Sequence, residues 1–518
     1  MAARANADDY VRQSEIDIVH YAIDLEISDL SDVISGTTTV RVMIQRDGVT
    51  GMWLDFAALT VDGLSVGGTA RPFSHSEGRL AFDFDRPYMR HEIAVVEVRY
   101  HGKPEKPGLI ITRNKHGRRV LFAENWPGRA HYWFPSIDHP SDKATVEFAI
   151  TAPEKYDVVA NGRLIETRSL MDGRRLTRWS EDEPIPTYCM VFEAAEFSIQ
   201  HRDADSVVPL VFYTFPQDSA TADPRLARSS QALNYFRQLI GPYPYEKLAE
   251  VEAATPMAGM ENSGAIFYAE EEFENAYTGE IPVAHEIAHQ WFGDSVTEAD
   301  WDHLWLSEGF ATYFDALFRE NLEGQEYLKQ LMARMAEAVK KYHQANPGPM
   351  IDPELKDLRK KLNAFNYQKG AWVLHMLRKA LGDETFFKGI RVYYSLYKGK
   401  NVVTEDFQRV MESASGTSLN AFFRQWCYQP GWPQYKLAWR WDDDTGEVEV
   451  TIQQTQNTGL FDVPLEVAIR SGNQNVLRTL RVAAQTEVFR FPLQSRPTAI
   501  DIDPDGWVLK SVTIAPPQ

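Results

Sequence analysis

The sequence predicts an α+β multidomain fold, in which β-rich regions at both ends flank a mainly helical one. Apolar and polar residues alternate over residues 10–200, recur at helical spacing over much of 201–433, and alternate again from residue 434. At 518 residues the chain is also too long for a single hydrophobic core. We therefore expect three domains, at residues 1–200, 201–433 and 434–518.

The N-terminal region carries the period of two that is typical of strands. Residues 21–28 place apolar side chains at every second position, which predicts a strand with one buried face. Turn signals such as Asn161-Gly162 separate several such stretches. Further strands are predicted at residues 38–44, 93–100, 145–152 and 191–199.

The middle region changes to helical spacing. Apolar residues follow a helical period over residues 226–240, and Gly241-Pro242 ends that pattern. Further helices are predicted at residues 325–343, 365–381, 385–397, 404–413 and 419–427.

Strand alternation then returns, and it predicts a small β-sandwich at residues 434–518. The strands are expected at residues 435–441, 447–453, 463–469, 477–482 and 488–492.

Composition excludes several kinds of partner. The net charge of −19 argues against nucleic acid and anionic membranes, because a phosphate-binding surface needs clustered Lys and Arg. No run of eighteen apolar residues occurs, so we expect no membrane-spanning segment and a soluble protein. Cys189 and Cys427 lie far apart in apolar surroundings, which predicts buried free thiols. The oligomeric state stays open.

The N-terminus leaves two compartments open. MAARANADDY lacks the apolar core of a signal peptide, which favours a cytoplasmic protein. Ala5-Asn6-Ala7 has the small-x-small pattern that precedes a cleavage point, which would fit an exported protein whose signal peptide has been removed.

Two histidines four residues apart give the clearest chemical signal. On a helix, His285 and His289 project from one face about one turn apart, so both imidazoles can bind one metal ion. Glu286 follows His285 directly and points beside the metal, where a carboxylate can take a proton from bound water. The pattern predicts a zinc site with Glu286 as general base, although a bare H-E-x-x-H also occurs by chance.

A third protein ligand has to come from elsewhere in the chain. Eighteen residues separate His289 from Glu308, which stands at the head of a second apolar helical run. Two His and one Glu leave the fourth position of zinc open, which is typical of catalytic rather than structural sites. We therefore expect one Zn²⁺ per chain.

The flanking residues add a resemblance to a known family. The stretch HEIAHQWFGDSVT, followed by Trp301, Trp305 and WLSEGFATYF, resembles the gluzincin aminopeptidases, the family of aminopeptidase N and leukotriene hydrolase. The resemblance implies an N-terminal β saddle, a thermolysin-like catalytic domain and Glu308 as zinc ligand. Familiar relatives continue into a helical domain, so this chain is expected to be a three-domain, bacterial-type member that lacks it.

A second motif concerns the substrate. Ala258-Gly259-Met260-Glu261-Asn262 resembles the family's Gly-x-Met-Glu-Asn motif, with Ala258 where Gly is usual. The resemblance implies that Ala258, Gly259 and Met260 line the substrate and that Glu261 binds its α-ammonium group. An ion pair between Glu261 and an Arg of the protein is the structural alternative.

Another acidic residue precedes the turn at residues 135–140, which matches the family's Pro-x-x-Asp-x-Pro. The resemblance implies that Glu124 is a second amine-binding residue, with Asn125 as the competing assignment. Glu124 could also be a solvated loop acid.

The stretch NYQKGAWVL resembles the family's Tyr-Glu-Lys-Gly-Ala helix start. It implies that Tyr367 stabilises the oxyanion, since a phenol donates a hydrogen bond without titrating near neutral pH. A buried core tyrosine is the alternative. Asp315, two turns beyond Glu308, is either an acceptor for a ligand imidazole or a solvated helix acid.

Together these residues predict a zinc aminopeptidase that acts on peptides with a free N-terminus. An epoxide hydrolase of the leukotriene type is one alternative, disfavoured because Arg359 and Leu362 replace the acid and the tyrosine of those relatives. A non-catalytic scaffold on the same fold is the other, disfavoured because every predicted ligand and the base are present.

Overall fold

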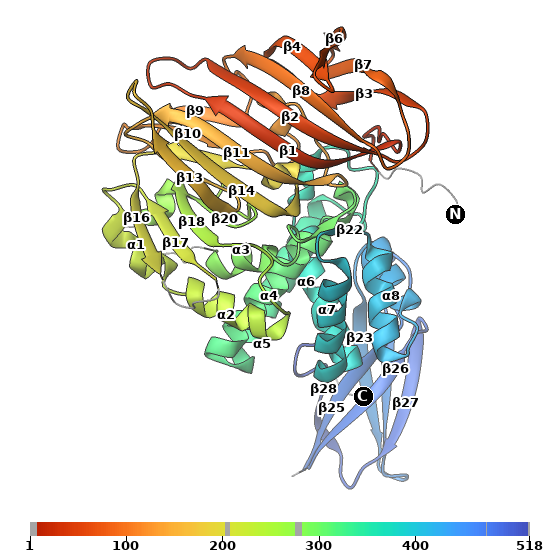
Figure 1. The fold of residues 1–518 in the computed structure, drawn as a ribbon. Coiled ribbons are helices and arrows are strands. Elements are labelled where there is room, and N and C mark those ends of the chain that lie inside the picture. Colours follow the sequence, from red (N-terminus) through yellow and green to blue (C-terminus); the bar gives the residue numbers. More distant parts are fainter. Residues whose placement is uncertain (1–7, 203–207, 275–281, 473, 516–518) are drawn as a thin grey trace. The chain divides into compact units, whose positions relative to one another are not determined.

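The computed structural model describes residues 8–202, 208–274, 282–472 and 474–515 (Figure 1). The possible cleavage point at Ala5-Asn6-Ala7 lies outside the described residues. The chain divides into two compact units. The first comprises Met1–Ser307 with Arg391–Thr404, and the second comprises Glu308–Ile390 with Glu405–Gln518.

The boundary between the units falls inside a helix, α4 (Trp305–Glu323), between Ser307 and Glu308. It therefore runs through the region that we predicted as one catalytic domain, residues 201–433. The division into three domains stays a proposal, made on the changes of pattern along the chain.

The first unit is built on a large mixed sheet whose middle strands lie side by side in Figure 1. The predicted alternation is confirmed in β1, where Tyr21, Ile23 and Leu25 are buried. In spatial order the sheet contains β13 (Arg163–Ser169), β14 (Arg174–Pro186), β11 (Lys143–Pro153), β1 (Ile16–Glu26), β2 (Ile34–Ile44), β8 (Ile93–Gly102), β4 (Thr60–Val66) and β5 (Thr69–Ala70).

Two smaller sheets complete the β-rich part of this unit. One contains β3 (Val49–Asp55), β7 (Arg79–Tyr88) and β6 (Phe73–Ser76). The other contains β12 (Asp157–Ala160), β15 (Phe192–Ala195), β10 (Arg119–Ala123) and β9 (Leu109–Arg113).

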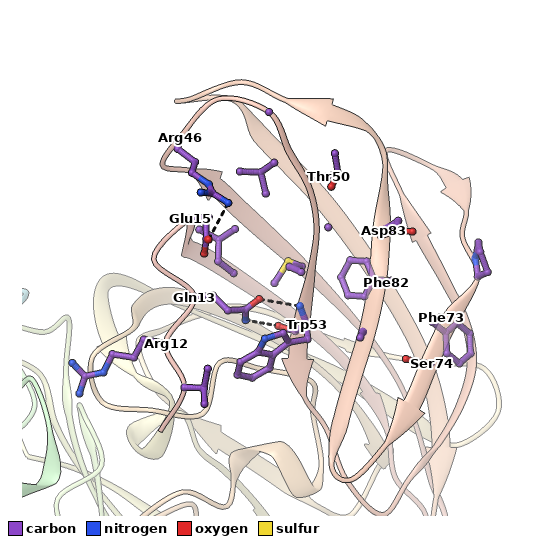
Figure 2. Close-up of a pocket in the computed structure, with 18 residues that line it drawn as sticks. Arg12, Gln13, Glu15, Arg46, Thr50, Trp53, Phe73, Ser74, Phe82 and Asp83 are labelled. Carbon is purple, nitrogen blue, oxygen red and sulfur yellow. Dashed lines mark hydrogen bonds and ion pairs between the residues drawn. The ribbon is translucent and has the colours of Figure 1, made fainter. Parts of the chain in front are cut away.

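A cavity of about 850 Å³ lies beside β3 and β7 (Figure 2). The carboxamide of Gln13, which lines the cavity, pairs with the edge of β3, donating to the carbonyl of Trp53 and accepting from its N–H. Glu15 and Arg46 form an ion pair at 3.0 Å on its wall. The residues that line this cavity include none of the predicted site residues.

The part of the first unit that carries the metal motif is a five-stranded sheet with three helices. Its strands are β16 (Ser198–Arg202), β17 (Leu210–Thr214), β18 (Leu248–Ala253), β20 (Ala265–Ala269) and β19 (Gly259–Met260). Its helices are α1 (Ser219–Leu226), α2 (Ser229–Leu239) and α3 (Val283–His289). A short parallel pair, β21 (Val296–Glu298) and β22 (Lys400–Val402), follows.

The second unit begins with helices and contains two π-helical turns. The predicted helix at residues 365–381 is present, but it opens with the π-helical turn Phe365–Lys369 before α6 (Gly370–Leu381). The remaining helices are α5 (Gln325–Ala345), α7 (Asp383–Tyr397), which continues into the first unit, α8 (Thr404–Ser415) and α9 (Asn420–Phe423), followed by the π-helical turn Arg424–Tyr428.

The C-terminal strands form two sheets, as the sequence predicts. One contains β27 (Thr486–Pro492), β24 (Glu447–Gln454), β23 (Gln434–Asp442) and β29 (Ser511–Ile514). The other contains β26 (Gln474–Val482), β25 (Val463–Ser471) and β28 (Pro497–Ile502).

The architecture confirms the predicted α+β multidomain class. Cys189 and Cys427 are both free and buried, as expected. Among the described residues, no helix combines the length and the apolar character that a membrane crossing requires.

Candidate metal centre and amine-binding loop

Helix α3 presents the two predicted histidine ligands on one face. The Nε2 atoms of His285 and His289 lie 3.0 Å apart. The Nδ1 atom of His289 lies 3.1 Å from the carbonyl oxygen of Phe292 and 3.0 Å from the hydroxyl of Ser307. With these acceptors beside Nδ1, the proton of neutral His289 belongs there and the Nε2 lone pair faces His285. Two imidazole nitrogens that converge in this way fit one divalent cation such as zinc.

The contacts of His289 were missed by sequence reasoning. Phe292 contributes only a backbone oxygen, and Ser307 is eighteen positions away along the chain. Asp315, which we considered for this role, accepts two hydrogen bonds from the Arg319 guanidinium, at 2.9 and 3.2 Å. No local pattern distinguishes these cases, because the acceptor is selected by the fold.

The predicted base and the predicted amine anchor lie beside the second histidine. Glu261, Glu286 and His289 each offer one ligand atom, and these three atoms lie within 4.8 Å of one another. Only 7%, 5% and 1% of these residues, respectively, is exposed. Two carboxylates that converge in a buried site need a cation close by, because an uncompensated buried charge is costly.

Gly259 explains how Glu286 is placed. A Cβ atom on Gly259 would lie 2.3 Å from Oε1 of Glu286 and 2.6 Å from its carboxyl carbon. Glycine is therefore the residue that lets the backbone of the Glu261 loop pack against the carboxylate of the base. Ala258, the departure from the family pattern, is exposed.

The second predicted amine-binding residue is already paired. Glu124 is 8% exposed, so it is a buried acid and not a solvated one. Its Oε1 accepts a hydrogen bond from Arg129 at 2.9 Å, and its Oε2 accepts one from the hydroxyl of Thr255 at 2.5 Å. A substrate ammonium group would therefore meet a carboxylate whose charge is already compensated.

Asn125, the competing assignment, is committed to the interior of the fold. Its side chain is fully buried, donates to the carbonyl oxygens of Thr187 and Met190, and accepts from the indole N–H of Trp133. These contacts hold the Asn125 side chain in the protein interior.

A buried acid, Asp294, contacts the residue at the C-terminus of α3. Asp294 is fully buried, and it accepts hydrogen bonds from the Gln290 amide at 2.9 Å and the Cys189 thiol at 3.4 Å. Burial, followed by the negative charge of Glu261, raises the pKa of Asp294 well above its usual range. A protonated, neutral Asp294 avoids adding another negative charge next to the site.

In the second unit, Glu308 and Tyr367 meet. The Tyr367 hydroxyl donates to Oε1 of Glu308 at 2.6 Å, and Glu308 is 5% exposed. The two elements approach closely at Gly309, where a Cβ atom would lie 2.8 Å from the Cα of Gly370 and 3.0 Å from the carbonyl oxygen of Asn366. Side chains larger than hydrogen at Gly309 would push the π-helical turn, and Tyr367 with it, away from Glu308.

Comparison with known protein families gives two matches in consecutive parts of the chain. Residues 18–189 match the Peptidase M1 N-terminal domain, and residues 225–426 match the Peptidase family M1 domain. Together the two matches cover more than two thirds of the sequence.

Individual relatives agree with these matches. Human glutamyl aminopeptidase is 27% identical over 458 residues, which are 80% of this chain and 47% of that protein. Tricorn protease-interacting factor F2 of Thermoplasma acidophilum is 26% identical over 84% of this chain and 57% of its own length. Probable aminopeptidase 2 of Sulfurisphaera tokodaii is 26% identical over 73% of this chain and 50% of its own. The chain thus spans about half the length of these relatives.

The helix with His285 and His289 and the loop with Glu261 both fall inside the second domain match, and most strands of the N-terminal sheets fall inside the first. With both of its characteristic domains present in consecutive order, this chain belongs to peptidase family M1.

Proposed function

We propose that this chain is a zinc-dependent aminopeptidase that hydrolyses the first peptide bond of peptides with a free N-terminus. The observation that carries the proposal is the convergence of Glu261, Glu286 and His289 within 4.8 Å in one compact unit. This arrangement combines a metal ligand, a base and a negative charge that can bind an ammonium group. Two of the three relatives described above are named as aminopeptidases, which agrees with it.

We assign the metal to His285, His289 and Glu308. The histidines converge through their Nε2 atoms, and Glu308 follows directly on α4 after Ser307, whose hydroxyl contacts His289. When bound, zinc supplies Lewis-acid polarisation of the scissile carbonyl and lowers the pKa of the attacking water.

Glu286 is the general base of the proposed reaction. Its carboxylate takes a proton from the attacking water and passes that proton to the amine that leaves. Gly259 leaves the space that this carboxylate occupies, which supports its position for the proton transfer.

Tyr367 is the proposed donor to the oxyanion. Negative charge develops on the carbonyl oxygen as water attacks, and a fixed phenol O–H stabilises that charge. In the described structure this hydroxyl is directed by its 2.6 Å hydrogen bond to Glu308, which supports a position next to that proposed ligand.

Glu261 determines where the substrate is cut. A carboxylate that pairs with the α-ammonium group holds the first residue of the peptide, so that only the first peptide bond reaches the base and the metal. Glu124 is proposed as a weaker second contact, because Arg129 already compensates its charge.

The two alternatives are less well supported. The epoxide hydrolase would need an acid and a tyrosine where this chain has Arg359 and Leu362. A non-catalytic scaffold would not need to retain the base, both histidines and Glu261 together.

The test uses a panel of aminoacyl amides, matched N-acetylated amides and a leukotriene-type epoxide, each with and without a chelator. We expect hydrolysis of free amides only, and its loss on chelation. Hydrolysis of acetylated amides at the same rate, epoxide opening alone, or no turnover with zinc fully bound would each overturn the proposal.

A further inference from the structure

The residue that follows the second histidine ligand, Gln290, lies between helix α3 and the loop that carries Glu261. The proposed reaction needs these two parts at a fixed distance. Gln290 caps the C-terminus of α3, and its side chain is fully buried. The side chain points to the loop at residues 261–264, which begins with Glu261 and turns back into β20.

The carboxamide of Gln290 makes four hydrogen bonds. Its Nε2 donates to the backbone oxygen of Glu261 at 2.8 Å and to Oδ2 of Asp294 at 2.9 Å. Its Oε1 accepts from the backbone N–H of Gly264 at 2.7 Å and from the hydroxyl of Tyr243 at 3.1 Å. Both N–H groups and both lone pairs are therefore used, which is the full capacity of a primary amide.

Two of these hydrogen bonds hold the backbone of the loop at its two ends, Glu261 and Gly264. The carbonyl of Glu261 and the N–H of Gly264 belong to one turn, and one side chain holds both. Because Gln290 is bonded covalently to His289, this contact fixes the backbone of Glu261 relative to the metal helix. Saturated buried networks of this kind are rigid, since any displacement leaves a buried polar group without a partner.

Other polar side chains hold the same loop, but from elements that carry no proposed catalytic group. Asn161 donates to the carbonyl oxygen of Ser263 at 2.7 Å, and Lys247 donates to the carbonyl oxygen of Gly264 at 2.9 Å. Asn161 and Lys247 therefore attach the loop to other parts of the first unit. Gln290, by contrast, connects the loop to the helix of the metal ligands.

We propose that Gln290 is a positioning residue that sets the distance between the carboxylate of Glu261 and the metal-binding face of α3, and thereby enforces recognition of the free substrate amine. This inference rests on the proposed function, because it concerns the residue that anchors the α-ammonium group. Gln290 itself touches neither substrate nor metal in this scheme; it acts through the backbone of Glu261.

Two substitutions separate the parts of the contact. Gln290→Met keeps the length of the side chain and removes all four hydrogen bonds. Gln290→Glu keeps the shape and two acceptor positions, but an ionised carboxylate cannot donate to the carbonyl oxygen of Glu261 and would repel the carboxylate of Glu261. Gln454→Met is the matched control. Gln454 is also buried and also grips a backbone at two points, donating to the carbonyl of Phe461 and accepting from its N–H, but it lies in the C-terminal sheets.

The readout is the ratio of kcat/KM for a free aminoacyl amide to that for its N-acetylated form. We expect Gln290→Met to reduce this ratio by roughly 10- to 100-fold, chiefly by raising KM for the free amide, because a misplaced anchor loses binding to the ammonium group. Gln290→Glu should reduce it as well, and Gln454→Met should leave it unchanged. A role in stability alone would lower both rates together and leave the ratio at the parent value, which would overturn the inference.

A double variant and a structural measurement complete the test. In the Glu261→Ala background the ratio should no longer respond to Gln290→Met, since the two residues act through one contact. Hydrogen exchange of peptides that span Gly264 should be faster in Gln290→Met and unchanged in Gln454→Met, with zinc content equal in all variants.

The outcomes distinguish this inference from the proposed function. If Glu261→Ala leaves the ratio intact, the proposed amine anchor is wrong and the inference falls with it. If Glu261→Ala removes the discrimination while Gln290→Met retains it, the proposed function stands and the positioning role is refuted. Faster exchange at Gly264 with an unchanged ratio would also refute it.

Discussion

At the scale of single residues, the base of the proposed reaction depends on a neighbour without a side chain. Glu286 packs against Gly259, and the space between them does not admit a methyl group. Ala258 stands one residue earlier and is exposed. We therefore expect a side chain to be tolerated at position 258 but not at position 259.

Gly259→Ala should lower kcat by about 10- to 100-fold, because the new Cβ displaces the Glu286 carboxylate from the line of proton transfer. Zinc should remain bound, since neither histidine moves. Ala258→Ser is the control, and its kcat should stay close to that of the parent. Equal loss in both variants would show that the loop as a whole, and not the contact with Glu286, is responsible.

Glu286→Gln should lower kcat by about two to four orders of magnitude, which is the usual contribution of a positioned general base. The amide cannot accept the proton of the attacking water. Steady-state kinetics together with metal analysis check this expectation, and a variant that keeps the parent kcat with full zinc content would remove Glu286 from the mechanism.

Tyr367→Phe should act mainly on kcat, by about 2.7–4 kcal/mol in transition-state stabilisation if it resembles the loss of one oxyanion donor. The loss of the hydrogen bond to Glu308 is a second consequence, so zinc affinity is measured in parallel. A change confined to zinc affinity would make Tyr367 a partner of the ligand and not a catalytic residue.

At the scale of elements, β18 shows how far a buried strand can depart from an apolar sequence. It lies between two parallel neighbours, β17 and β20, yet it carries Glu250 and Glu252, both buried. Burial raises the pKa of Glu250 to about 8 and that of Glu252 to about 9. Both carboxyl groups are therefore largely protonated in the folded protein near neutral pH.

These shifts predict a fall in stability with rising pH. The folded protein keeps the proton of Glu250 up to about pH 8, whereas the unfolded chain releases it near the ordinary value of 4.5. Between these two values the unfolded state binds fewer protons, so the free energy of unfolding decreases by up to about 1.4 kcal/mol per pH unit for this group.

Glu250→Gln should therefore make the stability less dependent on pH. The amide can still accept a hydrogen bond from Ser229 but does not titrate. Denaturant unfolding at pH 6 and pH 8 checks this expectation, with the exposed Glu97→Gln as control. A parent-like slope in Glu250→Gln would exclude Glu250 as its source.

Most helices could be predicted from periodicity, whereas many strands, among them β3, β4 and β7, were not predicted. Helix α2 begins at Ser229, three residues after the predicted start, because the apolar Leu226 belongs to the separate helix α1. Strands β28 and β29 were not predicted. They are short, and β28 begins at Pro497, so neither shows a clear alternation.

At the scale of the whole molecule, the proposed metal ligands stand on elements that are packed independently of any ion. His289 is held by Phe292 and Ser307 on the protein side, and Glu308 by Tyr367. Such a site differs from a zinc finger, in which the metal supplies the folding free energy.

Chelation should consequently abolish activity and leave the fold largely intact. We expect unchanged far-ultraviolet circular dichroism, a modest decrease in Tm, and recovery of activity when zinc is restored. Global unfolding on chelation would contradict this view of the site. Activity that persists after zinc has been removed completely would contradict the proposed mechanism itself.

The sequence by itself determined the local parts of this protein. The spacing of His285 and His289 implies a shared helical face, and the alternation of residues 21–28 implies a half-buried strand, because both periods follow from backbone geometry alone. The glutamates of the proposed site were likewise identified within short motifs.

Only the tertiary structure decided which distant groups meet. No local sequence pattern predicts three of the contacts at the site. These are the ion pair between Arg129 and Glu124, the hydroxyl of Ser307 beside His289, and the hydrogen bonds of Gln290 to the Glu261 loop. A buried polar side chain has to find a partner, but its type does not say where that partner lies along the chain. Packing of the folded chain makes that choice, because it alone brings residues of separate elements within hydrogen-bonding distance.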